Sequence, residues 1–189
     1  MSKITWTFLI FVACTGTSGP PPATAAEPPL PPPAPAAAPE APVRTPEESI
    51  AATHAATTLG DAATLQVGLA SKRSGDPIFA VSSPTAAKTK PPMAVLVREG
   101  VAYAGREGFS AWAGLQTERD AARLAVACTW LALGSRGDPI GLKAGRDTLP
   151  GPAFEPDGSL VFWYREPAKS AERKAIVTFA TDGTLATLQ

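Results

Sequence analysis

The sequence predicts an α+β fold, in which an antiparallel sheet packs against one central apolar helix and a further helix lies at the N-terminal end of the domain. A well-marked helix start stands at Thr45. A stretch within 117–133 is apolar almost all round, and strand-like pairs at 93–104 and 174–188 meet at glycine-containing turns. Elements of both kinds in one segment of this length indicate a single globular domain over 47–189.

The N-terminal helix is predicted from its cap. Thr45 offers an N-cap hydroxyl, Pro46 suits the first helical position, and Glu48 completes a capping box. The helix is expected to run through Ile50–Leu59 and to close at Gly60 in the left-handed conformation. The strands expected next are Ala63–Ala70, Ile78–Ser82, and a hairpin of Met93–Arg98 and Val101–Ala104 around Glu99-Gly100.

The central helix is predicted over Thr117–Leu133. Thr117 is expected to cap it and Gly134 to stop it. From Leu124 onward it has almost no polar face, so other elements should cover it on most sides. The remaining strands are predicted at Ser159–Arg165, Lys174–Ala180 and Leu185–Leu188, the last two joined by Asp182-Gly183.

Residues 1–13 are predicted to form a signal peptide. Lys3 supplies a positive start, and Ile4–Ala13 is an apolar run of about half the length that spans a bilayer. The run ends in Phe11-Val12-Ala13-Cys14, which resembles the lipobox of bacterial lipoproteins. That resemblance implies lipidation of Cys14 and a membrane-anchored protein of the bacterial cell envelope, facing the periplasm or sitting at the outer membrane. The alternative is an ordinary secretory signal cut near Ala23-Thr24-Ala25.

Residues 14–46 are predicted to be a disordered stalk. Pro20 to Pro46 contains 12 prolines and 8 alanines in 27 residues. Proline removes backbone donors and fixes φ, so no packed helix or sheet is expected. An extended polyproline segment of this length reaches ~80 Å. We interpret it as a spacer between membrane and domain, with a ligand for a proline-recognition domain as the alternative.

Charge gives no sign of a nucleic-acid partner. The chain has 17 basic and 17 acidic residues, and two of each precede Glu47, so 15 of each remain in the domain. A nucleic-acid surface needs a basic stripe interleaved with aromatic residues, and the sequence shows none.

Catalytic and metal-binding patterns are weak. The one histidine, His54, lies on the predicted first helix, and Cys128 stands in apolar company, where cysteine behaves as a core residue. No His/Cys spacing suits a metal and no phosphate-binding loop is present, so no cofactor is expected. The alternative to a binding protein is a secreted hydrolase with a carboxylate-based site in the 138–157 region, drawn from Asp138, Asp147, Glu155 and Asp157.

Two aromatic residues are candidates for binding. Phe109 and Trp112 fall in a glycine-rich connection predicted between strand and helix, where an aromatic pair is able to anchor a partner or to plug one end of the core. The sequence thus favours a non-catalytic envelope lipoprotein that acts as a tethered protein-binding or assembly module.

Anchoring is tested by the Cys14→Ser variant. Without the sulfur that carries the lipid, the protein should leave the detergent-requiring membrane fraction for a soluble or unprocessed form. Intact mass of the wild type should show a chain that begins at Cys14 and carries lipid. A lipid-free N-terminus near Ala26 would contradict the prediction.

Overall fold

The computed structural model describes residues 42–85, 90–143, 148–166 and 170–189. Cys14 and the predicted signal and stalk up to residue 41 lie outside the described residues, as does Asp147. The described unit is mixed α and β with antiparallel strand pairing, as predicted, but it has two four-stranded sheets instead of one. No helix in the described ranges has the length and apolar character needed to cross a membrane.

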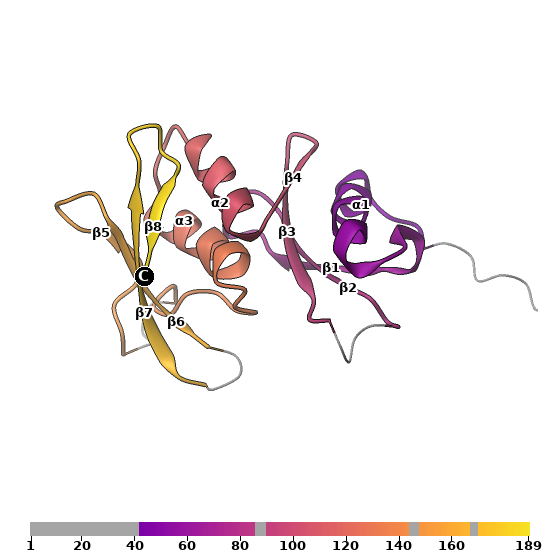
Figure 1. The fold of residues 1–189 in the computed structure, drawn as a ribbon. Helices are drawn as coiled ribbons and strands as arrows, with labels where there is room; N and C mark the ends of the chain where they lie inside the picture. The colour runs from indigo at the N-terminus through magenta and orange to yellow at the C-terminus, as the bar shows by residue number, and fades with distance from the viewer. Residues whose placement is uncertain (1–41, 86–89, 144–147, 167–169) are drawn as a thin grey trace, which may run out of the picture. The chain divides into compact units, whose positions relative to one another are not determined.

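The first sheet, here sheet A, follows helix α1 in the chain. Its strands pair in the order in which they occur (Figure 1). The first elements are α1 (Pro46–Leu59), the short helix η1 (Ala62–Thr64), β1 (Gln66–Ser71), β2 (Ile78–Ser82), β3 (Met93–Arg98) and β4 (Val101–Ala104).

Two helical segments and the second sheet, sheet B, complete the unit. Sheet B also pairs its strands in sequence order. The elements are α2 (Gly105–Gly114), α3 (Ala121–Ala127), the π-helical segment η2 (Cys128–Ala132), β5 (Ala153–Phe154), β6 (Leu160–Arg165), β7 (Glu172–Phe179) and β8 (Leu185–Leu188).

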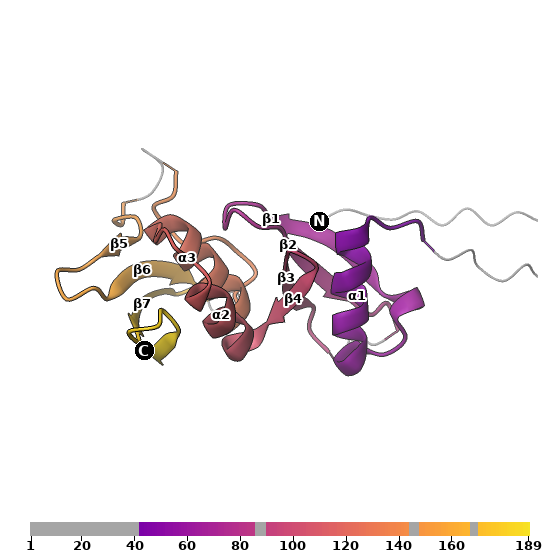
Figure 2. The ribbon, with the colours of Figure 1, turned by 90° about the horizontal axis from the view of Figure 1, so that it is seen from above.

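The layers are set by which faces of the strands are apolar. One face of sheet A packs against α1, and α2, α3 and η2 lie between the other face of sheet A and one face of sheet B (Figures 1 and 2). Sheet A therefore has both faces covered: Phe79, Val81, Val95 and Val97 pack toward α1, and Ile78 and Leu96 belong to the cluster around the other helices. Strands buried on both sides read as continuous apolar runs, which is how β2 and β3 read.

The N-terminal cap is as predicted. The Thr45 hydroxyl accepts from the Glu48 N–H at 3.2 Å, and the Glu48 carboxylate accepts from the Thr45 N–H at 2.9 Å. Just ahead of the cap, the Arg44 guanidinium donates to the Ala62 carbonyl at 2.7 Å and to the Leu65 carbonyl. Gly60 ends the helix at φ +111°, a positive φ but not the left-handed helical geometry expected.

The central helix begins later than predicted. Asp120, not Thr117, is the N-cap, and its carboxylate accepts from the Arg123 N–H at 2.8 Å. Residues 116–120 instead form a link between α2 and α3. The segment that forms α2 had itself been predicted as a loop. The helix α2 was not predicted because it contains two glycines that have a packing role. A Cβ on Gly108 would lie 2.9 Å from the Tyr103 backbone, and one on Gly114 would lie 3.1 Å from Thr184. Glycine here allows close packing of a helix and does not mark a turn.

The helix passes into π geometry at its buried end. The Leu133 N–H reaches the Cys128 carbonyl at 3.0 Å, and Gly134 then stops the helix at φ +61°, as predicted. Thr129 is fully buried in this turn, and its hydroxyl has no hydrogen-bond partner among the described residues. An unpaired buried hydroxyl costs free energy that the packing around it must offset.

Thr129→Val should therefore leave the fold unchanged or raise the free energy of unfolding, by about 1 kcal/mol, because valine keeps the shape and removes the unpaired hydroxyl. Urea denaturation measures the change. Thr53→Val, at an exposed position of α1, is the matched control and should stay within about 0.5 kcal/mol of wild type. A loss of more than about 1 kcal/mol at residue 129 alone would show that the hydroxyl has a partner.

Candidate functional site

The predicted aromatic anchors lie in the core. Phe109 and Trp112 are both on α2 and both have no exposed surface, with ring centroids 6.3 Å apart. This location fits the alternative in which the two side chains plug the core. Neither side chain is exposed, so neither can anchor a partner at the surface in this structure. The indole N–H of Trp112 still has a polar partner, the Asp76 carboxylate, at 3.0 Å.

The other residues considered for chemistry do not converge. His54 lies half-buried on α1, and Cys128 is fully buried, where burial raises the pKa of its thiol to about 12 although the charge of Arg106 acts in the opposite direction. A thiol with so high a pKa stays protonated and unreactive at neutral pH. Within the described ranges no three His, Cys, Asp or Glu side chains are grouped so as to hold a metal ion.

The carboxylates of the 138–157 region are separately engaged. Asp138 pairs with Arg73 at 3.0 Å. Asp157 accepts from the hydroxyl and the N–H of Ser159 in the hairpin turn between β5 and β6, and these bonds lower its pKa. Asp138 lines a surface hollow together with Arg73 and Arg165. Glu155 is exposed and is not part of that lining. The long connection itself crosses over at Gly141 and Gly151, where a Cβ on Gly141 would lie 2.6 Å from the Gly151 backbone.

The repeated sequence Gly-Asp-Pro-Ile, at 75–78 and 137–140, makes the same contact twice. Asp76 accepts from the indole of Trp112, and Asp138 accepts from the indole of Trp130 at 3.1 Å. The two copies stand in different places, the first between β1 and β2 and the second after η2. Two similar turns, each fixing a tryptophan, account for the repeat.

The turn between β1 and β2, residues 72–77, is the meeting point of these contacts. The Arg123 Nε–H donates to the Ser74 carbonyl at 2.8 Å, and the guanidinium lies over Gly75, where a Cβ would come within 2.0 Å of it. Arg73 reaches from the same turn to Asp138. Sheet A is thereby fixed to α2, to α3 and to the segment that leads into sheet B.

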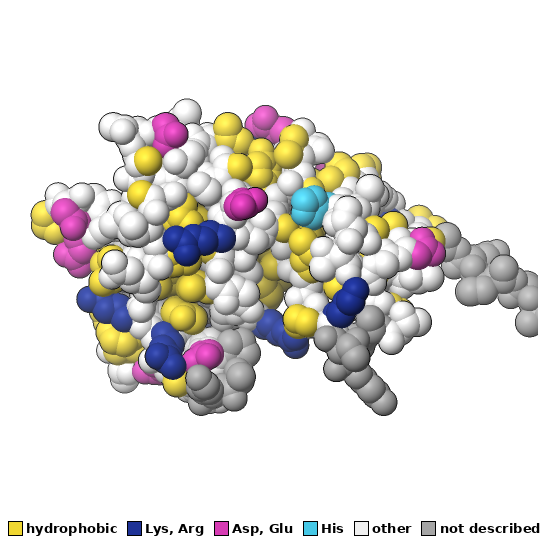
Figure 3. Space-filling view, in the orientation of Figure 1, with side chains coloured by type: hydrophobic (Ala, Val, Ile, Leu, Met, Phe, Trp, Pro, Cys, Tyr) yellow, Lys and Arg dark blue, Asp and Glu magenta, His cyan; other side chains and the backbone are white. Residues whose placement is uncertain are grey.

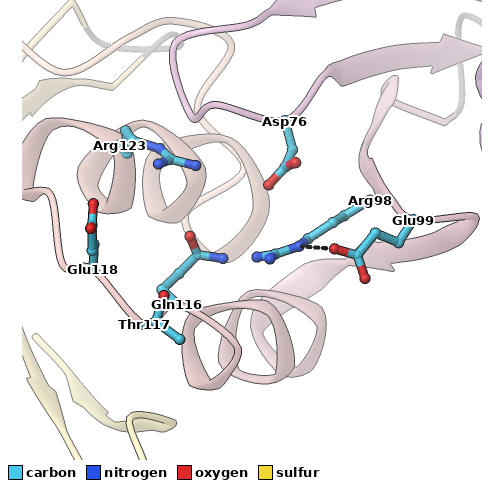
Figure 4. A pocket seen from close by; sticks show the side chains of 7 residues that line it. All are labelled: Asp76, Arg98, Glu99, Gln116, Thr117, Glu118 and Arg123. Carbon is cyan, nitrogen blue, oxygen red and sulfur yellow. Dashed lines mark hydrogen bonds and ion pairs between the residues drawn. The ribbon is translucent and has the colours of Figure 1, made fainter.

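A polar hollow of about 260 Å³ opens beside this turn. Its lining comes from the β1–β2 turn, the end of β3, the link between α2 and α3, and α3 itself (Figure 4). The lining residues are Asp76, Arg98, Glu99, Gln116, Thr117, Glu118 and Arg123.

Several hydrogen-bonding groups in the hollow have no partner among the residues that the structure describes. Arg98, whose side chain is 26% exposed, uses only its Nε, toward Glu99 at 3.4 Å. Neither Arg98 nor Arg123 forms an ion pair with Asp76 within the described residues, although Figure 4 shows both guanidinium groups on the sides of the hollow that face it. Glu99 stands at φ +51°, which is uncommon for a residue with a side chain and is found in tight hairpin turns.

The outer face of sheet B is a second candidate surface. Along β6 and β7, alternate residues face the helices, and of these Leu160, Phe162, Ala175 and Val177 are fully buried. The residues between them, Val161, Trp163 and Ile176, are only partly buried and belong to neither core cluster. Trp163 was not among the candidate residues taken from the sequence. Alternation of large side chains on both faces of β6 was the signal that could have identified it.

On the outer face of sheet B, charged residues lie next to this apolar strip across the strands. Val161 lies opposite Ile176, Trp163 opposite Lys174, and Arg165 opposite Glu172, with which it pairs at 3.3 Å. Charged and apolar side chains are likewise interspersed over the face of the molecule seen in Figure 3. An apolar strip with an aromatic centre and a charged margin is the composition of a protein interface.

Comparison with known proteins gives no match: no family model, no curated protein and no solved structure matches the chain. Function is therefore argued from the geometry of the chain itself.

The two Asp–Trp pairs make a prediction about stability. Asp76→Ala should lower the free energy of unfolding by about 1–3 kcal/mol, because it leaves the indole N–H of the fully buried Trp112 unpaired. Asp138→Ala is the matched control and should cost below about 1 kcal/mol, since Trp130 is partly exposed to water and the Arg73 ion pair is at the surface. Chemical denaturation of both variants measures the difference, and equal losses would show that burial does not set the cost.

Proposed function

We propose that the described unit is the protein-binding module of an exported, lipid-anchored envelope protein, and that it contacts its partner through the outer face of sheet B. The observation that carries the proposal is the strip of Val161, Trp163 and Ile176, which packs in neither core cluster. The opposite face of the same two strands holds the fully buried Leu160, Phe162, Ala175 and Val177.

The composition of this face supports recognition of a protein. Tryptophan and arginine are among the residues most enriched at positions that dominate binding energy. Here Trp163 and Arg165 lie two residues apart on β6 and therefore on the same face of the strand. Val161 and Ile176, opposite each other, extend the apolar area beside it. Contact with a partner would remove this area from water, and it would do so without any rearrangement of the sheet.

Charge indicates what kind of partner fits. The face carries Arg165, Glu172 and Lys174, so cations outnumber carboxylates, and Lys174 has no ion pair within the described residues. A partner surface with an apolar ridge flanked by acidic side chains would be complementary. A tether such as the predicted stalk would keep the module near its membrane and raise the effective concentration of an envelope partner there.

Photo-crosslinking in cells tests the proposal. A photoreactive residue in place of Trp163 should give one main protein adduct in the envelope fraction. The matched control replaces Leu115, which is 51% exposed and follows α2, outside the strands of sheet B. An adduct at residue 163 and none at residue 115 is the expected result.

Charge reversal then checks the chemistry of the partner. Lys174→Glu should lower the yield of the adduct at residue 163, because it sets a carboxylate against an acidic partner surface. Lys72→Glu, at an exposed lysine between β1 and β2 of sheet A, is the control and should leave the yield unchanged. No adduct at residue 163, equal adducts at residue 115, or a yield that does not respond to Lys174→Glu would overturn the proposal.

A further inference from the structure

We propose that the hollow beside the β1–β2 turn is a binding site for a small carboxylate that also bears an amide or amino N–H, such as an amino acid or the C-terminal residue of a peptide. The site is formed by Asp76, Arg98, Gln116 and Arg123, with Glu99, Thr117 and Glu118 also in its lining. It is separate from the outer face of sheet B and does not depend on the function proposed for that face.

The two arginines provide the site for the carboxylate. Arg98 and Arg123 each use Nε for a protein contact, toward Glu99 and toward the Ser74 carbonyl, so that each guanidinium is held in place. No hydrogen bond or ion pair within the described residues uses their terminal nitrogens. A planar guanidinium with free terminal N–H groups is suited to a carboxylate, which it binds with two parallel hydrogen bonds.

Asp76 limits the charge of the ligand and offers a place for its N–H. Within the described part of the chain its Oδ2 accepts from the Trp112 indole and its Oδ1 has no partner, so Oδ1 can accept from a ligand. Gln116 donates its own amide N–H to the Trp112 carbonyl at 3.3 Å, which leaves its side-chain oxygen as a second acceptor. The whole lining carries two guanidinium groups and three carboxylates, those of Asp76, Glu99 and Glu118, a net charge of −1. A monoanionic carboxylate held by the guanidinium groups therefore meets less repulsion there than a phosphate dianion.

The size of the hollow is consistent with such a ligand. Its volume of about 260 Å³ lies just below the range of roughly 300–1,000 Å³ typical of sites for drug-sized ligands. An amino acid or a terminal peptide residue is smaller than those ligands.

The tryptophans provide a direct readout. The chain has four, and the indole N–H of Trp112 is bonded to a residue of the site, whereas that of Trp130 is bonded to Asp138 and Trp163 lies on sheet B. Indole N–H resonances of the ¹⁵N-labelled full chain, assigned by Trp→Phe substitution, therefore report on this site and on two others at once.

The experiment titrates the full chain with three probes. Diglycine and acetyl-diglycine both carry the carboxylate and an amide N–H, and only diglycine carries an ammonium group; acetyl-diglycinamide lacks the carboxylate. The two acids should move the Trp112 resonance saturably and leave those of Trp130 and Trp163 in place, and the amide should not move it. Saturation with diglycine alone would identify the zwitterion as the ligand, and saturation with both acids would identify a peptide C-terminus.

Variants separate binding from folding. Arg98→Gln should raise the Kd by about tenfold to a hundredfold, through loss of charge-assisted hydrogen bonds, and Arg98→Lys should fall between Gln and wild type because it keeps the charge without the fork. Arg106→Gln removes an exposed charge outside the site and should leave the Kd unchanged. An unmoved Trp112 resonance, equal binding of acid and amide, equal saturation by inorganic phosphate, or the same loss in Arg106→Gln would overturn the proposal.

Discussion

The turn between β1 and β2 is the constraint on which the arrangement of the described unit depends. Among the described residues sheets A and B share no strand pairing, and the helices between them and this turn join the two sheets. Asp76 receives the Trp112 indole, Ser74 receives Arg123, and Arg73 reaches Asp138. Gly75, with φ +87°, lies under the Arg123 guanidinium, and a side chain at this position would force the guanidinium to move. Substitutions in the turn are therefore expected to affect both halves.

Burial on both faces of sheet A follows from the same arrangement. Ile78 and Leu96 share one apolar cluster with Phe162 and Val177 of sheet B, across the helices, while Val81 belongs to the cluster under α1. One continuous core thus joins two sheets that lie far apart in the sequence. Sheet B contributes only one of its faces to this core, whereas both faces of sheet A are covered. Val161 and Trp163, on the other face of sheet B, therefore lie outside either cluster.

Local signals in the sequence predicted the local elements well. The Thr45 cap, the hairpin at Glu99-Gly100 and the strand Ile78–Ser82 depend on neighbours in sequence, and the structure has them where predicted. Features that depend on distant neighbours were missed. Gly108 reads as a helix breaker until Tyr103 is seen against it, and no local pattern shows that strands form two sheets.

The candidate sites were harder still to predict. Phe109 and Trp112 looked like loop aromatics because α2 was not recognised, and Trp163, on the outer face of β6, was not among the candidates. The polar hollow joins residues up to 47 positions apart, Asp76 to Arg123, and spacing in the sequence gives no sign of it. Its one local signal was Glu99, a poor residue for the first position of a two-residue hairpin turn, where Asn is preferred.

The strain at Glu99 has a structural consequence for Arg98. Glu99 is 82% exposed, and an exposed ion pair contributes little to stability, so its contact with Arg98 does not offset the cost of a positive φ. The contact occupies Nε of Arg98 and leaves its terminal nitrogens without a partner among the described residues. Backbone strain of this kind is concentrated at sites that bind ligands, where the geometry of one side chain matters more than local stability. Glu99 is therefore best understood as a positioning residue for Arg98 in the site that we propose.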